Sequence, residues 1–424
     1  MKIRMKNIEE CRKLFQIEMP KDLVEKATKE VYAQIKKVAK IPGFRPGFAP
    51  QDLLEKHYSK DAEGEVLKQL VPEGYREALE THKVIPLGFP KILNVKLEKD
   101  KPFTFEAEVD TRPVIKLRNY KGIKVNKKRI STPQSEVTEA LERLRSVYAK
   151  YNDVERPVKK GDYAVCNVEA YADDKLITKK NQNMWIQAEK EASLLGMGEE
   201  LVGMTKGQTK EINTKLPENY PDKKYAGKNA KFKILINEVK EKVLPMLDDT
   251  FAKELKVEDL DTLKKNIEAQ LFARKENNLK IKMENQILEK LLNDHKFSVP
   301  TSLVNSQKED LKKRLQADLM QKGVQKSDAE AKIKEFDSKL EKDAMDKVRI
   351  YFLLEEIAEK EKIFANDDDL SAKIKYIALS EGRPEQEIKE YYEKENLLGG
   401  LKEEIKEEKT LEFLLKSSEV IEEK

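Results

Sequence analysis

The chain has 424 residues, more than a single hydrophobic core usually organises, so about two to four domains are expected. Its 83 basic and 79 acidic residues leave a net charge of +4, which argues against a dedicated nucleic-acid-binding protein. Charged residues make up 38% of the chain and apolar residues 39%, with one tryptophan. This composition favours long solvated helices over the compact body of an enzyme.

The chain contains two cysteines, Cys11 and Cys166, too few and too far apart in sequence for a disulfide framework. Free thiols indicate a reducing compartment. The N-terminal residues are basic but lack the apolar stretch of a signal peptide, and no apolar run is long enough to span a membrane. We therefore expect a cytoplasmic protein.

Residues 43–50 are the most informative segment of the chain. Their prolines fix φ and lack an amide donor, while their glycines permit positive φ, so neither a helix nor a strand continues through them. Apolar residues at helical spacing precede the segment from Leu23 to Val38 and follow it from Gln51 to Leu70. The sequence therefore predicts two helices joined by a rigid loop.

This loop carries two aromatic residues, Phe44 and Phe48, on either side of an arginine. Residues 31–50 contain no acid, and their cations are Lys36, Lys37, Lys40 and Arg45. The local field is therefore positive, and a cation between aromatics suits docking onto a phosphate-rich or acidic surface. The alternative is a tight interhelical turn in which Phe44 and Phe48 fold back onto the domain.

The pattern Gly43-Phe44-Arg45-x-Gly47-x-x-Pro50 resembles the G-F-R-x-G-x-x-P signature of the bacterial trigger factor family of ribosome-associated chaperones. In that family the loop docks beside the nascent-chain exit tunnel, and its Phe and Arg, here Phe44 and Arg45, make the contact. The resemblance implies ribosome binding through Gly43, Phe44, Arg45, Gly47 and Pro50, with Lys36, Lys37 and Lys40 supplying charge. Pro46 and Phe48 stand where family members often have Lys, which lowers the charge of the tip.

Hydrophobic periodicity divides the rest of the chain. Alternating patterns predict strands over residues 91–97, 103–109, 163–171 and 231–239, the last two within a β-rich module. A helix with a shared apolar face is predicted from Val137, Leu141, Leu144 and Val147.

The chain is strongly helical after Pro245. One predicted helix ends near Val299, and a second pauses near Gly323. A third, over residues 348–357, is apolar enough to be expected against other helices. Shorter helices are expected from there to Lys424.

The order of these parts matches the resemblance, which implies a multidomain α+β protein. Its expected parts are an N-terminal α+β ribosome-docking domain over residues 1–115, a linker helix region packing with the C-terminal body over 116–157, an FKBP-like peptidyl-prolyl isomerase domain over 158–243, and an all-α C-terminal chaperone domain over 244–424.

The resemblance also implies where an isomerase pocket would lie. An FKBP-type enzyme uses a dry aromatic cradle that favours the twisted amide, without nucleophile or metal. Tyr220 and Phe232 fall on pocket positions of the family, and Leu194 and Met197 are expected to line the groove. The family's Asp-Phe and Ile-Pro-Gly-Phe are replaced here by Asn167-Val168 and Leu194-Leu195-Gly196-Met197.

We therefore expect a peptide-binding module whose isomerase activity is weak or absent. Equally open is that Tyr220 and Phe232 are only core residues of a small barrel.

Other site chemistry is not indicated. The histidines His57, His82 and His295 are isolated, no Cys/His spacing matches a zinc site, and no nucleotide-binding fingerprint occurs. We expect no cofactor or metal and a chaperone that works without ATP. Sparse apolar residues on the charged helices could contact unfolded chains or could be core: Met283, Leu319, Met320, Ile377, Leu397, Leu398 and Phe413.

The expected partners are the ribosome near its exit tunnel and unfolded or nascent polypeptides, with a homodimer off the ribosome. No membrane partner is expected, and no nucleic acid beyond the ribosome. Two other functions stay open, a free cytosolic holdase or assembly chaperone without ribosome docking, and an enzyme acting mainly as a prolyl isomerase.

Overall fold

The computed structural model describes residues 1–42, 44–45, 47–98, 100–172, 175–177, 181–189, 197–216, 224–322, 324 and 326–423. The chain divides into two compact units. The first comprises Met1–Val125, Glu284–Ala317 and Glu330–Val420, and the second comprises Asn126–Met283, Asp318–Ala329 and Ile421–Lys424. Among the described residues, no helix is both long and apolar enough to cross a membrane.

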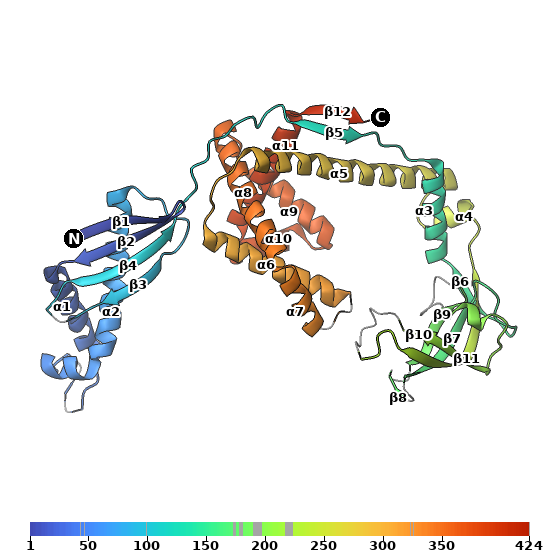
Figure 1. Ribbon diagram of the computed structural model, residues 1–424, viewed down its shortest axis with the longest axis horizontal. Coiled ribbons are helices and arrows are strands. Elements are labelled where there is room, and N and C mark those ends of the chain that lie inside the picture. The colour runs from blue at the N-terminus through green and yellow to red at the C-terminus, as the bar shows by residue number, and fades with distance from the viewer. Residues whose placement is uncertain are drawn as a thin grey trace. The chain divides into compact units, whose positions relative to one another are not determined.

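The first unit begins with a four-stranded antiparallel sheet in the order β1-β2-β4-β3 (Figure 1). Its strands are β1 (Lys2–Glu9), β2 (Arg12–Met19), β3 (Lys91–Lys96) and β4 (Phe103–Asp110). Every second residue of β4 is buried, and Phe15, Phe103 and Phe105 belong to one core. The strands predicted over residues 91–97 and 103–109 are confirmed.

Helices α1 (Lys21–Val38) and α2 (Gln51–His82) form a hairpin that covers one face of this sheet (Figure 1). Both helices were expected from the apolar spacing on either side of the loop, and both are confirmed. Gly74 of α2 faces the sheet, where an added Cβ would lie 3.1 Å from the Phe105 ring. The missing side chain therefore allows the helix to approach the sheet closely.

Strands β1 and β2 are not among the predicted strands. Strand β1 is at the edge of the sheet, and most of its residues are exposed. Its sequence therefore alternates lysine or arginine with a few apolar residues. Ile3 and Met5 pack against the core while their neighbours face solvent. The prediction described this segment only as a basic N-terminus and missed its role in the sheet.

Seven helices of the C-terminal part are described: α5 (Leu260–Asp294), α6 (Thr301–Gln321), α7 (Lys326–Glu335), α8 (Asp337–Glu361), α9 (Asp367–Glu381), α10 (Glu385–Lys394) and α11 (Leu398–Lys416). Within the first unit, Val304 packs with Val348 and Phe352 of α8. A second core joins α9, α10 and α11 through Ile374, Ile388 and Leu401. The apolar segment over residues 348–357 is buried as predicted, whereas Gly323 lies outside the described residues.

The segment after β4 contacts the helices of the same unit through polar groups. The Arg112 guanidinium lies 2.8 Å from the carboxylate of Glu355, which is buried on α8. The backbone N–H of Arg118 donates to Nε2 of His295 at 2.9 Å, and Nδ1 of His295 lies 2.9 Å from the carbonyl oxygen of Leu291. The His295 ring therefore bridges the backbone of Arg118 and the end of α5.

The final described strand, β12 (Glu419–Glu423), pairs with β5 (Lys124–Lys128). The prediction of helices up to Lys424 is therefore wrong over β12. Two adjacent β-branched residues, Val420 and Ile421, favour a strand, but its partners come from a distant part of the chain. They are β5 and, just before it, the Ile123 carbonyl oxygen, which accepts from the N–H of Glu419 at 2.9 Å.

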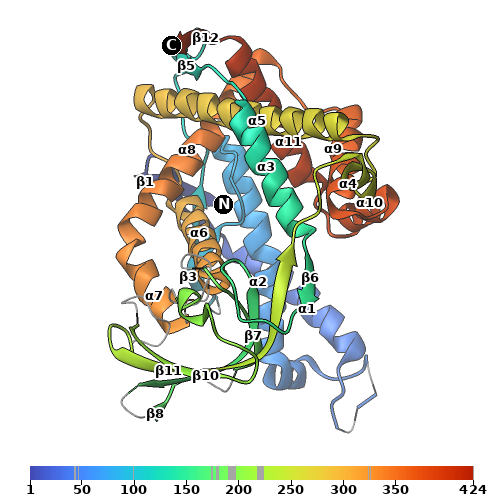
Figure 2. The same ribbon diagram turned by 90° about the vertical axis from the view of Figure 1, so that its right-hand side faces the viewer.

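The second unit contains a β module built on the paired strands β7 (Tyr163–Ala172) and β11 (Asn229–Val243), both predicted. The other strands of its sheet are β6 (Lys150–Asp153), β8 (Lys175–Leu176), β9 (Asn181–Gln187) and β10 (Thr209–Lys215). A short 3₁₀ helix, η2 (Glu199–Leu201), closes one side of the core, and Leu201 is fully buried. Figure 2 shows the long, curved β11 beside β7.

Strands β6 and β11 hold together the two ends of this module. Asp153 pairs with Lys240 and Lys150 pairs with Val243 in an antiparallel register, so the chain enters and leaves the module on neighbouring strands. Outside the module, α3 (Gln134–Val147) and α4 (Asp249–Glu254) pack with the first turns of α5.

Of the residues predicted to form the apolar face of α3, Val137 and Leu141 are buried and Leu144 packs against them. Val147 is 78% exposed, so its inclusion in that face was wrong. It is the last residue of the helix, where the chain turns away from the helical cluster. The predicted fold class is confirmed, with an α+β N-terminal part, a β-rich central module and a C-terminal part that is helical apart from β12.

Candidate functional sites

The loop between α1 and α2 lies at the end of the helical hairpin remote from the sheet (Figure 1). Phe44 is 42% exposed and Phe48 is 74% exposed. Arg45, between them in sequence, is also exposed. The alternative in which both rings fold back onto the domain is therefore wrong.

A small core of its own supports this loop. Its members are Ala39, Ile41, Ala49 and Leu54, with Tyr32, Ile35, Leu53 and Tyr58 packed around them. The hydroxyl of Tyr58 accepts from the backbone N–H of Lys40 at 3.1 Å, at the point where α2 departs from helical geometry. Because Ala49 fills this core, the neighbouring Phe48 is directed outward.

Backbone hydrogen bonds fix the tip on this core. The N–H of Gly47 donates to the carbonyl oxygen of Lys36 at 2.9 Å, and the N–H of Phe48 donates to that of Arg45 at 3.0 Å. Gly47 has φ +94, a conformation that favours glycine. The aromatic residues are therefore presented by a defined turn.

The predicted cations lie beside this turn. Lys37, Lys40 and Arg45 are exposed, and Lys36 is half-buried in the last turn of α1. Pro50 is exposed and forms the N-cap position of α2, whereas Gly43 lies outside the described residues. Since residues 31–50 contain no acid, the surface can attract anionic groups.

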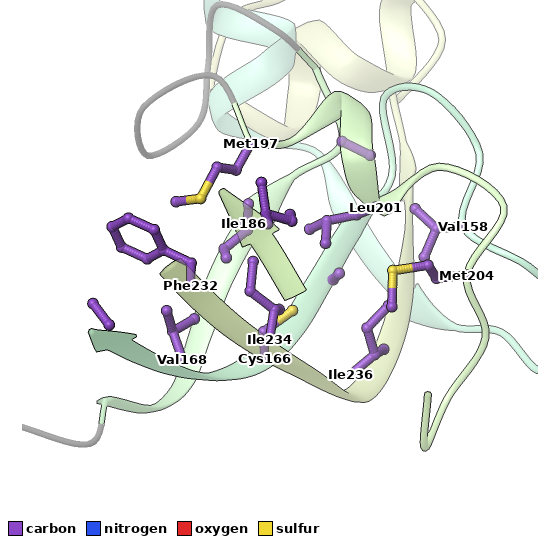
Figure 3. Close-up of a cluster of buried hydrophobic side chains, with 14 of the residues drawn as sticks. Val158, Cys166, Val168, Ile186, Met197, Leu201, Met204, Phe232, Ile234 and Ile236 are labelled. Carbon is purple, nitrogen blue, oxygen red and sulfur yellow. The ribbon is translucent and has the colours of Figure 1, made fainter. Parts of the chain in front are cut away.

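The candidate isomerase pocket is described in part. Phe232 of β11 and Met197, just before η2, are each 2% exposed and share one buried cluster. Figure 3 shows both side chains at one end of this cluster, with Val158, Met204 and Ile236 at the other. Tyr220 and Leu194 lie outside the described residues. What is described of the pocket is apolar and well packed.

Asn167 and Val168, at the altered pocket strand, face opposite sides of the sheet. Val168 is buried in the cluster that holds Phe232. The Asn167 side chain exchanges hydrogen bonds with Asn237, whose Nδ2 also donates to Asn183 at 2.9 Å. Asn167 therefore helps to join β7, β11 and β9 on the outer face.

An exposed aromatic cluster on the β module was missed by sequence reasoning. The ring of Tyr151 lies 5.2 Å from that of Tyr163 and 5.3 Å from that of Trp185, between centroids. Lys240 lies over the Trp185 ring at 5.4 Å. Only strand register brings these residues together, although the single tryptophan in an alternating segment was a signal.

Both thiols and one histidine, His295, are buried. Burial raises the pKa of the Cys166 thiol to about 12. Burial, followed by the nearby Glu10 and Asp110, raises the pKa of Cys11. His57 is exposed, while His295 is buried with both ring nitrogens beside backbone groups. Within the described ranges, no group of three or more His, Cys, Asp or Glu side chains is arranged to hold a metal ion.

The candidate client-binding residues differ in exposure. Met320 is 51% exposed and Leu397 is 42% exposed. Met283 is buried and is therefore a core residue rather than a client-binding residue. The half-buried candidates are Leu319, Ile377, Leu398 and Phe413.

Three family models match the chain. Residues 1–144 match the bacterial trigger factor protein, residues 259–416 match the trigger factor C-terminus, and residues 154–240 match the FKBP-type peptidyl-prolyl cis-trans isomerase. Together they account for the three parts of the fold.

Sequence relatives that are similar over nearly their whole length are named trigger factor as well. The chain is 31% identical over 428 residues to the trigger factor of Bdellovibrio bacteriovorus, covering 99% of this chain and 97% of the relative. It is 29% identical over 417 residues to that of Syntrophotalea carbinolica, covering 98% and 95%. A solved trigger factor chaperone is 21% identical, with a TM-score of 0.49 and coverage of 98% of this chain and 99% of that one.

Proposed function

We propose, since the chain belongs to the trigger factor family, that it is an ATP-independent chaperone that docks at the ribosomal exit tunnel and holds nascent polypeptides in an open, folding-competent state. In this proposal the protein works in the cytoplasm, and its partners are the ribosome and unfolded or nascent chains. It forms a homodimer when off the ribosome.

The observation that carries this proposal is the presentation of Phe44 and Arg45 on a loop with its own core. Exposing an aromatic ring has a free-energy cost in water, which a docking contact recovers. Gly43, Gly47 and Pro50 shape the loop, and Lys36, Lys37 and Lys40 supply attraction to phosphate. Tethering then raises the chaperone's effective concentration beside each emerging chain, so weak contacts with clients suffice.

The test is co-sedimentation with vacant bacterial ribosomes of the parent chain and of the double variant Phe44→Ala, Arg45→Ala. Docking through the loop requires the parent to pellet and the variant to remain in the supernatant. If neither pellets at low salt, the protein is a free holdase.

A second activity, prolyl isomerisation, is favoured by the FKBP-type match over residues 154–240. We propose that Tyr220, Phe232, Leu194 and Met197 line its pocket and that turnover is weak. The aromatic residue that the family carries at the position of Met197 is absent, so complementarity to the twisted amide is reduced.

A protease-coupled proline peptide assay on the full chain tests this assignment. The variant Met197→Phe restores an aromatic side chain of similar volume, so kcat/KM should rise. An unchanged rate would place Met197 in the core only. No catalysis by either chain would leave a peptide-binding module.

The domain boundaries stay a prediction: 1–115 for docking, 116–157 for the linker helix region, 158–243 for the isomerase and 244–424 for the chaperone body. Limited proteolysis tests them, because cleavage should concentrate at these junctions if they separate domains.

A further inference from the structure

Phe48 is the more exposed of the two aromatic residues on the docking loop. The residue is 74% exposed, compared with 42% for Phe44. Its position is fixed by its own N–H donating to the Arg45 carbonyl oxygen and by the buried Ala49 that follows it. The ring is therefore held in water by the same turn that presents Phe44.

The charge of the loop is unevenly distributed. Residues 41–50 contain one charged side chain, Arg45, while Lys36, Lys37 and Lys40 precede the tip. A tip built to follow phosphates would carry more cations, because each phosphate contact uses one. The tip is instead an apolar surface with a basic segment behind it.

From this distribution we propose that Phe48 is a second apolar anchor of the docking loop, which inserts with Phe44 into an apolar recess formed by protein side chains on the ribosome. The inference rests on the proposed docking function and adds a contact residue and the chemistry of its partner. Protein surfaces provide recesses that bury a whole phenyl ring, and such anchors dominate binding energy.

The contact has a distinctive salt dependence. Interactions between exposed charges weaken as ionic strength rises, whereas burial of an aromatic ring does not. Removing Phe48 should therefore lower ribosome affinity at every salt concentration and leave the slope of affinity against salt unchanged. Removing Lys37 or Lys40 should reduce that slope instead.

The experiment measures ribosome affinity of the full chain by co-sedimentation across a salt series. Phe48→Ala should weaken binding by about tenfold to a hundredfold, the range expected for burying one phenyl side chain. Phe48→Leu should recover most of the loss, while Phe48→Lys should not recover it at high salt. Phe89→Ala is the matched control, because Phe89 is fully exposed elsewhere in the first unit and should leave affinity unchanged.

The outcomes separate this inference from the proposed function. If Phe44→Ala abolishes binding and Phe48→Ala does not weaken it, docking stands and the second anchor is rejected. If the parent chain does not bind ribosomes, both fail. Replacing Phe48 with a photo-reactive benzoylphenylalanine should give adducts with ribosomal protein, and adducts only with ribosomal RNA would reject the protein recess.

Discussion

The backbone N–H of Gly47 donates to the carbonyl oxygen of Lys36 at 2.9 Å, so the tip of the loop is joined to the last turn of α1. This bond requires the chain to turn with φ +94 at Gly47. It places Phe44 and Phe48 on the same short turn without either ring entering the core beneath them.

Gly47→Ala should therefore impair docking. An alanine at this φ costs about 1–2 kcal/mol of conformational free energy. If the loop must keep this turn to dock, the binding free energy falls by the same amount, and ribosome affinity falls about fivefold to thirtyfold. Gly207→Ala is a matched control, because Gly207 has φ +82 and its N–H donates to Ile236, but it lies in the β module. Equal ribosome affinity for the parent and Gly47→Ala would show that the turn is not required.

Two glycines of α2 should respond to alanine with opposite signs. At Gly74 a Cβ would meet the Phe105 ring at 3.1 Å, and that ring is buried and stacked on Phe103 at 5.3 Å, so it has no room to move. Overpacking of about 1–3 kcal/mol exceeds the helix-propensity gain of about 1 kcal/mol, so Gly74→Ala should destabilise the protein by roughly 1 kcal/mol.

Gly64 is the control for this effect, since nothing lies within 4 Å of its added Cβ. Gly64→Ala should stabilise the same helix by about 0.5–1 kcal/mol. Urea unfolding followed by far-UV circular dichroism measures both. A stabilising Gly74→Ala would mean that the sheet relaxes away from α2.

The buried carboxylate of Glu355 depends on Arg112. Arg112→Ala leaves that charge without its guanidinium partner, and the expected loss is about 1–3 kcal/mol of unfolding free energy. Glu359 also pairs with Arg112, at 3.2 Å, but its side chain is 61% exposed. Glu359→Gln should therefore change stability by no more than about 0.5 kcal/mol.

The double variant Arg112→Met, Glu355→Met removes both charges together and should recover most of the loss in thermal and urea unfolding. If it is no more stable than Arg112→Ala, an unpaired buried charge is not the source of the defect.

Both thiols should resist modification in the folded protein. Cys166 is fully buried with a pKa of about 12, and Cys11 donates to the Ser298 carbonyl oxygen. Ellman's reagent at neutral pH should react with neither until the chain is unfolded, whereas an exposed thiol introduced as Ser59→Cys should react at once. Rapid reaction of the parent chain would contradict the burial of both cysteines.

The raised pKa of Cys166 also determines how the unfolding free energy changes with pH. Its folded pKa lies above the ordinary value of 9.0, so the unfolded chain loses its proton first as pH rises. The stabilising contribution is complete below about pH 9 and is lost towards pH 12. Cys166→Ala should remove that part of the alkaline decline in unfolding free energy.

Local sequence patterns predicted the secondary structure correctly wherever a segment's own residues determine its conformation. Glycine and proline predicted the loop, and helical spacing predicted α1, α2 and α8. Strands β1 and β12 were missed because their stability comes from partners elsewhere in the chain. Exposure of Phe44 and Phe48 followed from the loop chemistry, but the core under them depends on Leu54 and Tyr58 from the next helix.

Pocket geometry depends on strand register, which the sequence does not specify. The sheet is irregular between Ile236 and Glu238 and again between Cys166 and Val168. Each shift changes which residues of the two paired strands lie opposite each other. Ordinary alternation between the buried Cys166 and Val168 directs Asn167 to the outer face, whereas the pairing of the strands brings Trp185 beside Tyr151.

The pairing of β6 with the end of β11 makes the β module a self-contained insertion. Its two boundary strands are already hydrogen-bonded, and Val137, Leu141, Phe251 and Leu263 form a separate core outside it. A short hairpin turn could replace the whole module without stretching the flanking chain. Such a module can be gained, exchanged or lost in evolution as one piece, independently of the loop that carries Phe44.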